Sequence, residues 1–296
     1  MVGVNVSSRS LRQVELAPIQ KMIPDELLLH ILSYIDPYSL AKVACVTSTW
    51  RCLAEHPKHW ETACVEALGP HKKEWSTWQK LMATLHRHSW KRLFLFTPHL
   101  RYEGLYVSRN TYVRTGVVEW RANNTVHLVS YFRYFRFLPD GTFIYRTSPL
   151  VISKVVKSLT THVRLHGEAK VSNKAGRDEQ VHSGRYAIKG AQVYCVVVYP
   201  NSRNTEIRLH LSLRSTHANA YDRLDMHSIV SYDKELQTSA SLVPEPDPDD
   251  ESLPEAVASS RGHHRGLSCC VFVPWEAVAT CPLNQPVGKM DFYVAG

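Results

Sequence analysis

The spacing of apolar residues changes once along this chain of 296 residues, near Arg101. From Ile23 to about Phe96 they recur at helical spacing, whereas beyond Arg101 they alternate and β-branched residues, aromatic residues and turn signals become frequent. Apolar residues spaced at a period of 3.6 do not share one face of a strand, and residues spaced at a period of two do not share one face of a helix. The chain is therefore predicted to be an α+β protein, with amino-terminal helices followed by an antiparallel β domain.

The helical part begins at a clear start signal. Pro24 suits the first position of a helix, and Asp25 and Glu26 add negative charge to its first turn, where the helix dipole favours it. The longest pattern, from Glu74 to about Phe94, predicts one rigid connector helix or, equally well, an amphipathic core helix. The predicted helices cover Pro24–Ile35, Pro37–Cys45, Thr49–Glu55, Pro57–Leu68 and Glu74 to about Phe94.

The predicted strands must pair their edges, and either a sandwich or a closed barrel achieves this. A barrel is the favoured prediction. The sharpest hairpin signal is YFRYFRFLPDGTFIYRT, in which Pro139, Asp140 and Gly141 supply a turn. The predicted strands are Gly104–Ser108, Tyr112–Thr115, Val126–Leu138, Thr142–Thr147, Gly184–Ile188, Gln192–Tyr199, Glu206–Arg214, Met226–Tyr232 and Gly266–Val273.

Two segments are predicted to lack regular structure. One is the amino terminus, residues 1–20. The other is residues 234–264, whose stretch SLVPEPDPDDESLPEAVASSRGHH holds six acids between Glu245 and Glu255 and no aromatic residue. Such a segment buries too little apolar surface to order itself, so we expect a flexible acidic insertion between two strands.

Charge and apolar content limit the function classes. Residues 61–233 hold 25 Lys plus Arg against 13 Asp plus Glu, so the middle of the chain can attract nucleic acid, anionic lipid or an acidic peptide. The longest apolar runs fall far short of the roughly 20 residues of a membrane helix, and no signal-peptide pattern opens the chain. We therefore expect a cytoplasmic or nuclear protein, with no membrane partner and nucleic acid an unlikely one.

Sequence signatures of catalysis and metal binding are missing. No G-x-S-x-G, P-loop or G-x-G-x-x-G motif occurs. Cys269 and Cys270 are neighbours in a predicted strand and point to opposite faces, which prevents joint coordination of one ion. The stretch Tyr131 to Phe137 resembles an RNA-stacking strand but lacks its glycine-containing motif. The prediction is a non-catalytic chain with no metal and no cofactor.

The stretch MIPDELLLHILSYIDPYSLAKVACVTSTWR carries more apolar side chains than a small helical unit can cover. Leu27, Ile31 and Ile35 form one row at helical spacing, Leu28 and Leu32 form a second, and Leu29 widens the stripe. A unit near the lower size limit for folding has no interior for all of them. Either the β domain or a second protein must cover the surplus.

Residue types and spacing across this stretch resemble the F-box. The matching order runs from Ile23-Pro24-Asp25-Glu26-Leu27 through Asp36-Pro37 to Trp50-Arg51 and Trp60. The resemblance implies a three-helix F-box at residues 21–66 that binds the Skp adaptor and, through it, a cullin scaffold. It further implies that the residues at or behind this interface are Ile23, Pro24, Leu27, Leu28, Ile31, Leu32, Leu40, Val43, Val46 and Trp50.

The segment from Ser89 to about Gly190 is similar to the carboxyl-terminal domain of the F-box only protein 9 family, and the resemblance becomes weaker after it. The stretches SWKRLFLFTPHLRYEGLYVSRNTYVRTG and YFRYFRFLPDGTFIYRTSP carry this resemblance. The domain division that we expect is connector helices at residues 67–97 and a substrate-presenting β domain at residues 98–296. The expected function is a substrate-recognition adaptor of an SCF-type ubiquitin ligase. The alternative is a ligand-binding or scaffold barrel whose F-box controls its own turnover.

Arginines among the aromatic residues of the β domain suggest where a substrate could bind. An arginine there needs a partner, because burying an unpaired charge is costly. Either a carboxylate such as Glu103 or Glu119 supplies it, or an acidic or phosphorylated substrate does. The candidate substrate residues are Tyr102, Tyr106, Arg114, Arg133 and Arg136.

Overall fold

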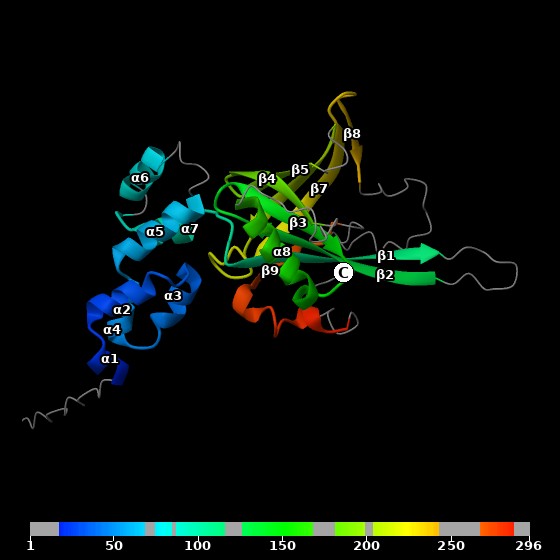
Figure 1. The fold of residues 1–296 in the computed structure, drawn as a ribbon. Helices are drawn as coiled ribbons and strands as arrows, with labels where there is room; N and C mark the ends of the chain where they lie inside the picture. Colours follow the sequence, from blue (N-terminus) through cyan, green and yellow to red (C-terminus); the bar gives the residue numbers. More distant parts are fainter. Residues whose placement is uncertain are drawn as a thin grey trace, which may run out of the picture. The chain divides into compact units, whose positions relative to one another are not determined.

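The computed structural model describes residues 18–68, 75–84, 87–115, 126–167, 181–198, 204–242 and 267–286. The chain divides into two compact units, the first ending at Ala63 and the second beginning at Cys64 (Figure 1). Each unit is described by itself. Among the described residues no helix combines the length and apolar character needed to cross a membrane.

The first unit is built from short capped helices. They are α1 (Pro18–Met22), α2 (Asp25–Leu32), α3 (Pro37–Val43) and α4 (Ser48–Ala54), and α5 (Pro57–Leu68) runs from this unit into the next. Asp36 caps α3 by accepting hydrogen bonds of 3.0 Å from the amides of Tyr38 and Ser39. Thr47 caps α4 through the Trp50 amide at 3.2 Å. These caps explain where the helices begin.

The helices α2, α3 and α4 share a small core. Leu32, Leu40 and Ala54 are buried in it. Ile35, Val43, Ala44 and Leu53 pack around them, partly exposed. The predicted three-helix arrangement is therefore present. The predicted disordered segment 1–20 overlaps α1 at its end, and residues 1–17 lie outside the described part.

The prediction of one long connector helix is wrong. The segment holds two helices, α6 (Trp75–Thr84) and α7 (Trp90–Phe96). Between them Arg87 and His88 have φ angles of 51° and 58°, in the left-handed region that ends a helix. Ser89 then caps α7 by accepting a hydrogen bond from the Arg92 amide at 3.3 Å. Apolar spacing continues across this break, which is why periodicity alone did not reveal it.

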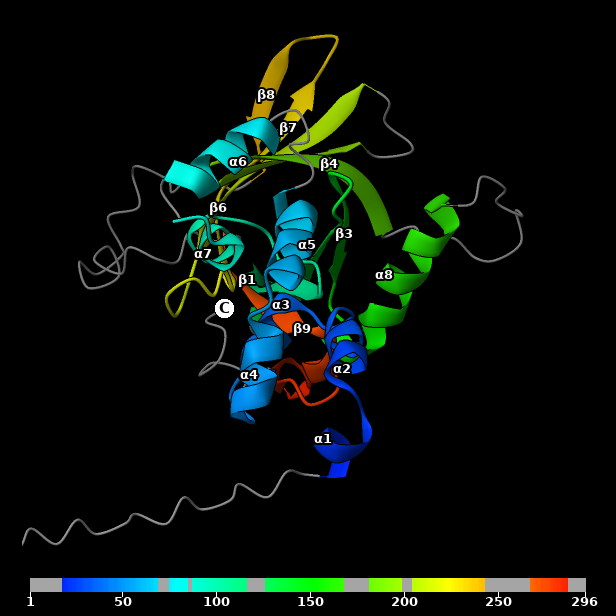
Figure 2. The ribbon, with the colours of Figure 1, turned by 90° about the vertical axis from the view of Figure 1, so that its left-hand side faces the viewer.

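The second unit is a closed antiparallel barrel. Strands β1 to β7 pair in order around it, and β9 pairs with both β1 and β7 (Figures 1 and 2). The strands are β1 (Gly104–Thr115), β2 (Val126–Phe137), β3 (Thr142–Ser148), β4 (Val181–Lys189), β5 (Gln192–Val198), β6 (Thr205–Arg214), β7 (Arg223–Asp233), β8 (Thr238–Ser241) and β9 (Cys270–Pro274). The barrel prediction is confirmed, and the sandwich alternative is excluded.

Two strand predictions need correction. The segments 104–108 and 112–115 form one continuous strand, β1, paired with β2 over its length. Strand β8 lies within the predicted flexible insertion 234–264, where it extends β7 as a hairpin. Its short side chains are all exposed, and backbone pairing with β7 orders it without a core of its own. Residues 243–266 of the insertion lie outside the described part.

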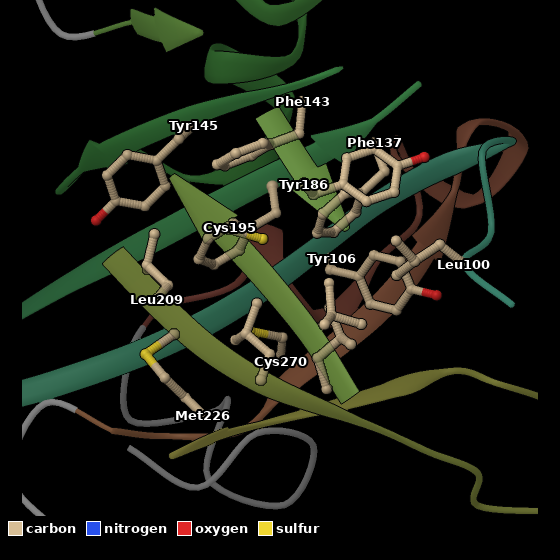
Figure 3. Close-up of a cluster of buried hydrophobic side chains, with 14 of the residues drawn as sticks. Leu100, Tyr106, Phe137, Phe143, Tyr145, Tyr186, Cys195, Leu209, Met226 and Cys270 are labelled. Atoms are coloured by element: carbon tan, nitrogen blue, oxygen red, sulfur yellow. The ribbon is translucent and has the colours of Figure 1, made fainter. Parts of the chain in front are cut away.

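The barrel interior is filled by side chains. Aromatic rings from different strands pack edge to face, among them Tyr106, Phe137 and Tyr186 (Figure 3). Leu209, Met226 and Cys270 belong to the same cluster. A ligand in this part of the barrel would have to displace them. The alternative of a ligand-binding barrel stays a prediction.

A second apolar layer covers part of the barrel from outside. Helix α8 (Ile152–Gly167) lies against β3 and β4 (Figure 2), and two short helices, η2 (Trp275–Ala277) and η3 (Pro282–Asn284), complete the cover. Phe132 and Tyr134 of β2 are buried under this layer, while Phe135 and Phe137 of the same strand fill the interior. Both faces of β2 are therefore buried, which accounts for its lack of apolar-polar alternation.

Candidate functional site

Helix α2 separates its apolar residues into two sets. Leu28 and Leu32 are each 5% exposed and lie one helical turn apart. Leu27 and Ile31, also one turn apart, are 55% and 49% exposed. Because i and i+4 share a face of a helix, one row packs inward and the other stays open to solvent.

Further exposed apolar side chains lie in the same unit. Met22 precedes α2, Tyr34 follows it, and Val46 lies between α3 and α4; all are exposed. We call Met22, Leu27, Ile31, Tyr34 and Val46 the exposed apolar set. So many exposed apolar side chains in so small a unit are typical of a surface that another protein covers.

The ten predicted interface residues fall into three groups. Leu28, Leu32 and Leu40 are buried, and Ile23, Val43 and Trp50 are partly buried. Those that remain exposed are Pro24, Leu27, Ile31 and Val46. The buried group builds the unit, and the exposed group is the part that a partner can contact.

Two members of the exposed apolar set were missed by sequence reasoning. Tyr34 lies seven residues after Leu27 and its ring stands 5.2 Å from that of His30 in an edge-on arrangement. The spacing Leu27, Ile31, Tyr34 continues one helical face and could have identified it. Met22 lies before the start signal at Pro24, outside the α2 pattern, so periodicity gives no signal for it.

Among the predicted substrate residues, Arg133 points into the barrel. Its guanidinium donates hydrogen bonds to Asn110 Oδ1 at 3.3 Å and to the Tyr131 hydroxyl at 3.0 Å. Asn110 in turn donates to Ser108 Oγ at 3.1 Å. Asn110 and Ser108 are fully buried, so this end of the interior is polar whereas the end near Tyr106 is aromatic.

Arg136 lies on the opposite face of the same strand. It donates to the Leu159 carbonyl of α8 at 3.1 Å, and its guanidinium stands 4.8 Å from the Trp275 ring centroid. Burial lowers the pKa of Arg136 below its ordinary value. Arg133 and Arg136 therefore cannot belong to one site, because side chains an odd number of residues apart on a strand face opposite ways.

The two predicted tyrosines have structural partners. The Tyr106 hydroxyl donates to the Tyr221 carbonyl at 2.8 Å. The Tyr102 hydroxyl lies 3.1 Å from that of Tyr186, and burial raises the pKa of Tyr102 to about 12. Arg114 is in β1, but its side chain lies outside the described part, as does Glu119.

Glu103 pairs with a different arginine from those predicted. Its carboxylate forms an ion pair with Arg101, whose guanidinium also stands 4.1 Å from the Phe272 ring centroid. The predicted substrate residues are thus spread over the interior, the outer face and the aromatic end of the barrel. Within the described residues no group of three or more His, Cys, Asp or Glu could hold a metal ion.

Comparisons with known proteins match both units. The family model described as F-box only protein C-terminal region matches residues 79–296, and the F-box-like model matches residues 21–66. The F-box protein pof7 of Schizosaccharomyces pombe (strain 972 / ATCC 24843) is 24% identical over 228 residues, which are 72% of this chain and 61% of that protein. The chain thus spans less than two thirds of the length of this relative. Because the carboxyl-terminal model covers well over half of the sequence, the chain belongs to the family of F-box only proteins that carry this region.

Proposed function

We propose that this chain is a substrate-recognition adaptor of an SCF-type ubiquitin ligase and works in the cytoplasm or nucleus. Its F-box binds the Skp adaptor through the exposed apolar set and so joins a cullin scaffold. Its β domain binds the protein to be ubiquitinated, and the chain itself carries out no catalytic step. The F-box-like match at residues 21–66 and the name of the fission yeast relative support this assignment.

The observation that carries the proposal is the division of α2 into a buried row and an exposed row. Leu27 and Ile31 are left about half exposed while Leu28 and Leu32 complete the core of the unit. Covering the remaining surface of one such side chain contributes about 1 kcal/mol. A partner that covers the whole exposed apolar set therefore gains roughly 5 kcal/mol, enough to offset the lower range of the association cost.

The test is the double variant Leu27→Ala with Ile31→Ala in the full chain. We expect its affinity for purified Skp adaptor to fall about 30-fold, because two side chains worth about 1 kcal/mol each are lost from the interface. Titration calorimetry measures the affinity, and circular dichroism checks that the helices remain.

The matched control is Val65→Ala with Leu150→Ala. Both residues are exposed apolar side chains outside the exposed apolar set, at 45% and 43% exposure. This control should leave the Skp affinity unchanged. Equal affinity of the unmutated chain and the α2 variant would contradict the proposal, as would an equal loss in the control.

A further inference from the structure

The outer surface of strands β4 to β7 forms a patch that the proposed function has not used. Its members come from adjacent strands. Ala187 of β4 lies opposite Tyr194 of β5, Tyr194 lies opposite His210 of β6, and His227 lies where the β6–β7 register shifts beside His210. We define the outer patch as Arg185, Lys189, Tyr194, His210 and His227. All but His210 are exposed, and His210 is half-buried.

The rings of this patch stand upright on the sheet. Tyr194 and His210 are stacked with ring centroids 4.8 Å apart and an angle of 3° between their planes. That distance equals the spacing of neighbouring strands, so the rings face each other and turn their edges to solvent. His227 continues the row, 5.0 Å from His210.

Hydrogen bonds hold the two imidazoles in this orientation. His210 Nε2 lies 2.9 Å from Gln192 Oε1, and His227 Nε2 lies 2.8 Å from Ser212 Oγ. Aromatic rings carry negative charge on their faces and positive charge on their edges. A row of upright rings therefore presents its positively polarised side to a partner.

The charged residues around the row add to this polarity. Arg185 and Lys189 flank Ala187 on the same face of β4, and neither forms an ion pair within the described residues. Two carboxylates of β6 and β7 are already neutralised by cations. Glu206 lies 2.7 Å from Arg208 and 3.0 Å from Lys234, and Asp225 lies 2.8 Å from Arg214.

We propose that the outer patch binds an acidic segment of a protein, rich in Asp and Glu. That this protein is the one recruited for ubiquitination rests on the proposed function. The charge of Arg185 and Lys189 and the positive ring edges both attract carboxylates. Single-stranded nucleic acid fits less well, because its bases stack on open ring faces, and the stacking of Tyr194 on His210 covers one face of each of these rings.

The test uses the full chain and a short fluorescein-labelled peptide that alternates Glu with Ser, with a Gln-for-Glu peptide as its match. Fluorescence anisotropy should show binding of the Glu peptide that is at least about tenfold tighter than that of the Gln peptide. The variant Arg185→Glu with Lys189→Glu should lower the affinity for the Glu peptide about tenfold or more. Tyr194→Ala should also weaken it, since the row loses its outermost ring.

The matched control is Lys154→Glu with Lys157→Glu. These exposed lysines lie on α8, and the change in net charge is the same. We expect at most about a twofold effect on the peptide affinity. An equal loss in both charge-reversal variants would overturn the proposal, because it would reduce the binding to long-range charge alone. Equal affinities for the Glu peptide and the Gln peptide would also overturn the proposal. So would an oligouridylate that binds more tightly than the Glu peptide and loses affinity in the same variants.

The Skp affinity of the same proteins separates this inference from the proposed function. Arg185→Glu with Lys189→Glu should leave Skp binding unchanged, and Arg185→Gln with Lys189→Gln serves as a milder variant if the reversal unfolds the barrel. If the unmutated chain binds Skp but not the Glu peptide, the proposal for the outer patch is wrong and the proposed function stands. Peptide binding without Skp binding defeats the adaptor assignment and leaves the patch as an acidic-peptide site.

Discussion

At the scale of single residues, His99 shows how burial fixes a protonation state in the β unit. The side chain is buried, and its ring lies 4.2 Å from the Phe94 ring and 4.7 Å from the Tyr221 ring. Nδ1 lies 2.8 Å from the Thr97 carbonyl oxygen, which requires the proton on Nδ1. Burial lowers the pKa of His99 to about 4, because the charged form loses its hydration.

This histidine should make the β unit sensitive to acid. The pKa is about 6.5 in the unfolded chain and about 4 in the folded one, so between these values the unfolded state binds more protons. The free energy of unfolding is unaffected above pH 6.5 and falls by about 3 kcal/mol as the pH drops to 4. Urea unfolding of the full chain at several pH values measures this change in the free energy of unfolding.

The variant His99→Gln should have a flatter pH dependence of the urea midpoint than the unmutated chain. His217→Gln, at an exposed position, is the matched control and should keep the steep dependence. If the urea midpoints of His99→Gln and His217→Gln fall by the same amount between pH 6.5 and 4, His99 is not the source of the acid sensitivity.

At the scale of elements, α8 shows how tertiary contacts can override local preference. Its residues Val155 and Val156 are β-branched, which lowers helix propensity, and no helix is predicted there from the sequence. Ile152, Val155 and Leu159 nevertheless form a fully buried row that packs on the barrel. Ser158 accepts a hydrogen bond of 2.5 Å from Arg146 of β3. The sheet supplies the apolar surface that makes this helix stable.

Two substitutions on α8 should separate its buried and exposed faces. Leu159→Ala should lower the free energy of unfolding by roughly 2–5 kcal/mol, because it leaves a cavity against the barrel. Lys157→Ala, on the exposed face, should change it by less than about 0.5 kcal/mol. Urea denaturation of both variants measures the difference, and equal stabilities would show that α8 does not pack as described.

At the scale of the whole molecule, closure of the barrel depends on its last strand. Val271 and Cys270 of β9 lie opposite Arg223 and Leu224 of β7, and on its other side β9 pairs with β1. Without β9, both β1 and β7 would present unpaired edges. The strand also places buried side chains in both apolar layers, among them Phe272 inside and Val273 outside.

Ending the chain at residue 242 should therefore unfold the barrel. The buried apolar side chains of β9 contribute roughly 1.5–3 kcal/mol each, which together is comparable with the whole stability of a domain. A chain ending at residue 286 keeps β9 and η3 and is the matched control. Calorimetry should show a cooperative transition for the longer chain only. A cooperative transition of the same size in the shorter chain would show that β9 is dispensable.

What the sequence alone determined is local or carried by a contiguous pattern. Asp36 and Thr47 cap helices through amides two or three residues away, and the Pro139-Asp140-Gly141 turn joins strands adjacent in sequence. The F-box pattern lies within one short stretch, and comparison with the family confirms it. Each of these features depends on neighbours in the chain, so residue order specifies it.

What only the tertiary structure decided depends on residues far apart in the chain. Which row of α2 stays exposed depends on packing against α4, and the contact of Arg136 with the Leu159 carbonyl depends on α8 covering the outer face of β2. The upright row exists because strand pairing places Tyr194 opposite His210, and the register shift between β6 and β7 places His227 beside His210. The sequence sets the periodicity of each strand, but the register between strands is set by the free energy of closing the whole barrel.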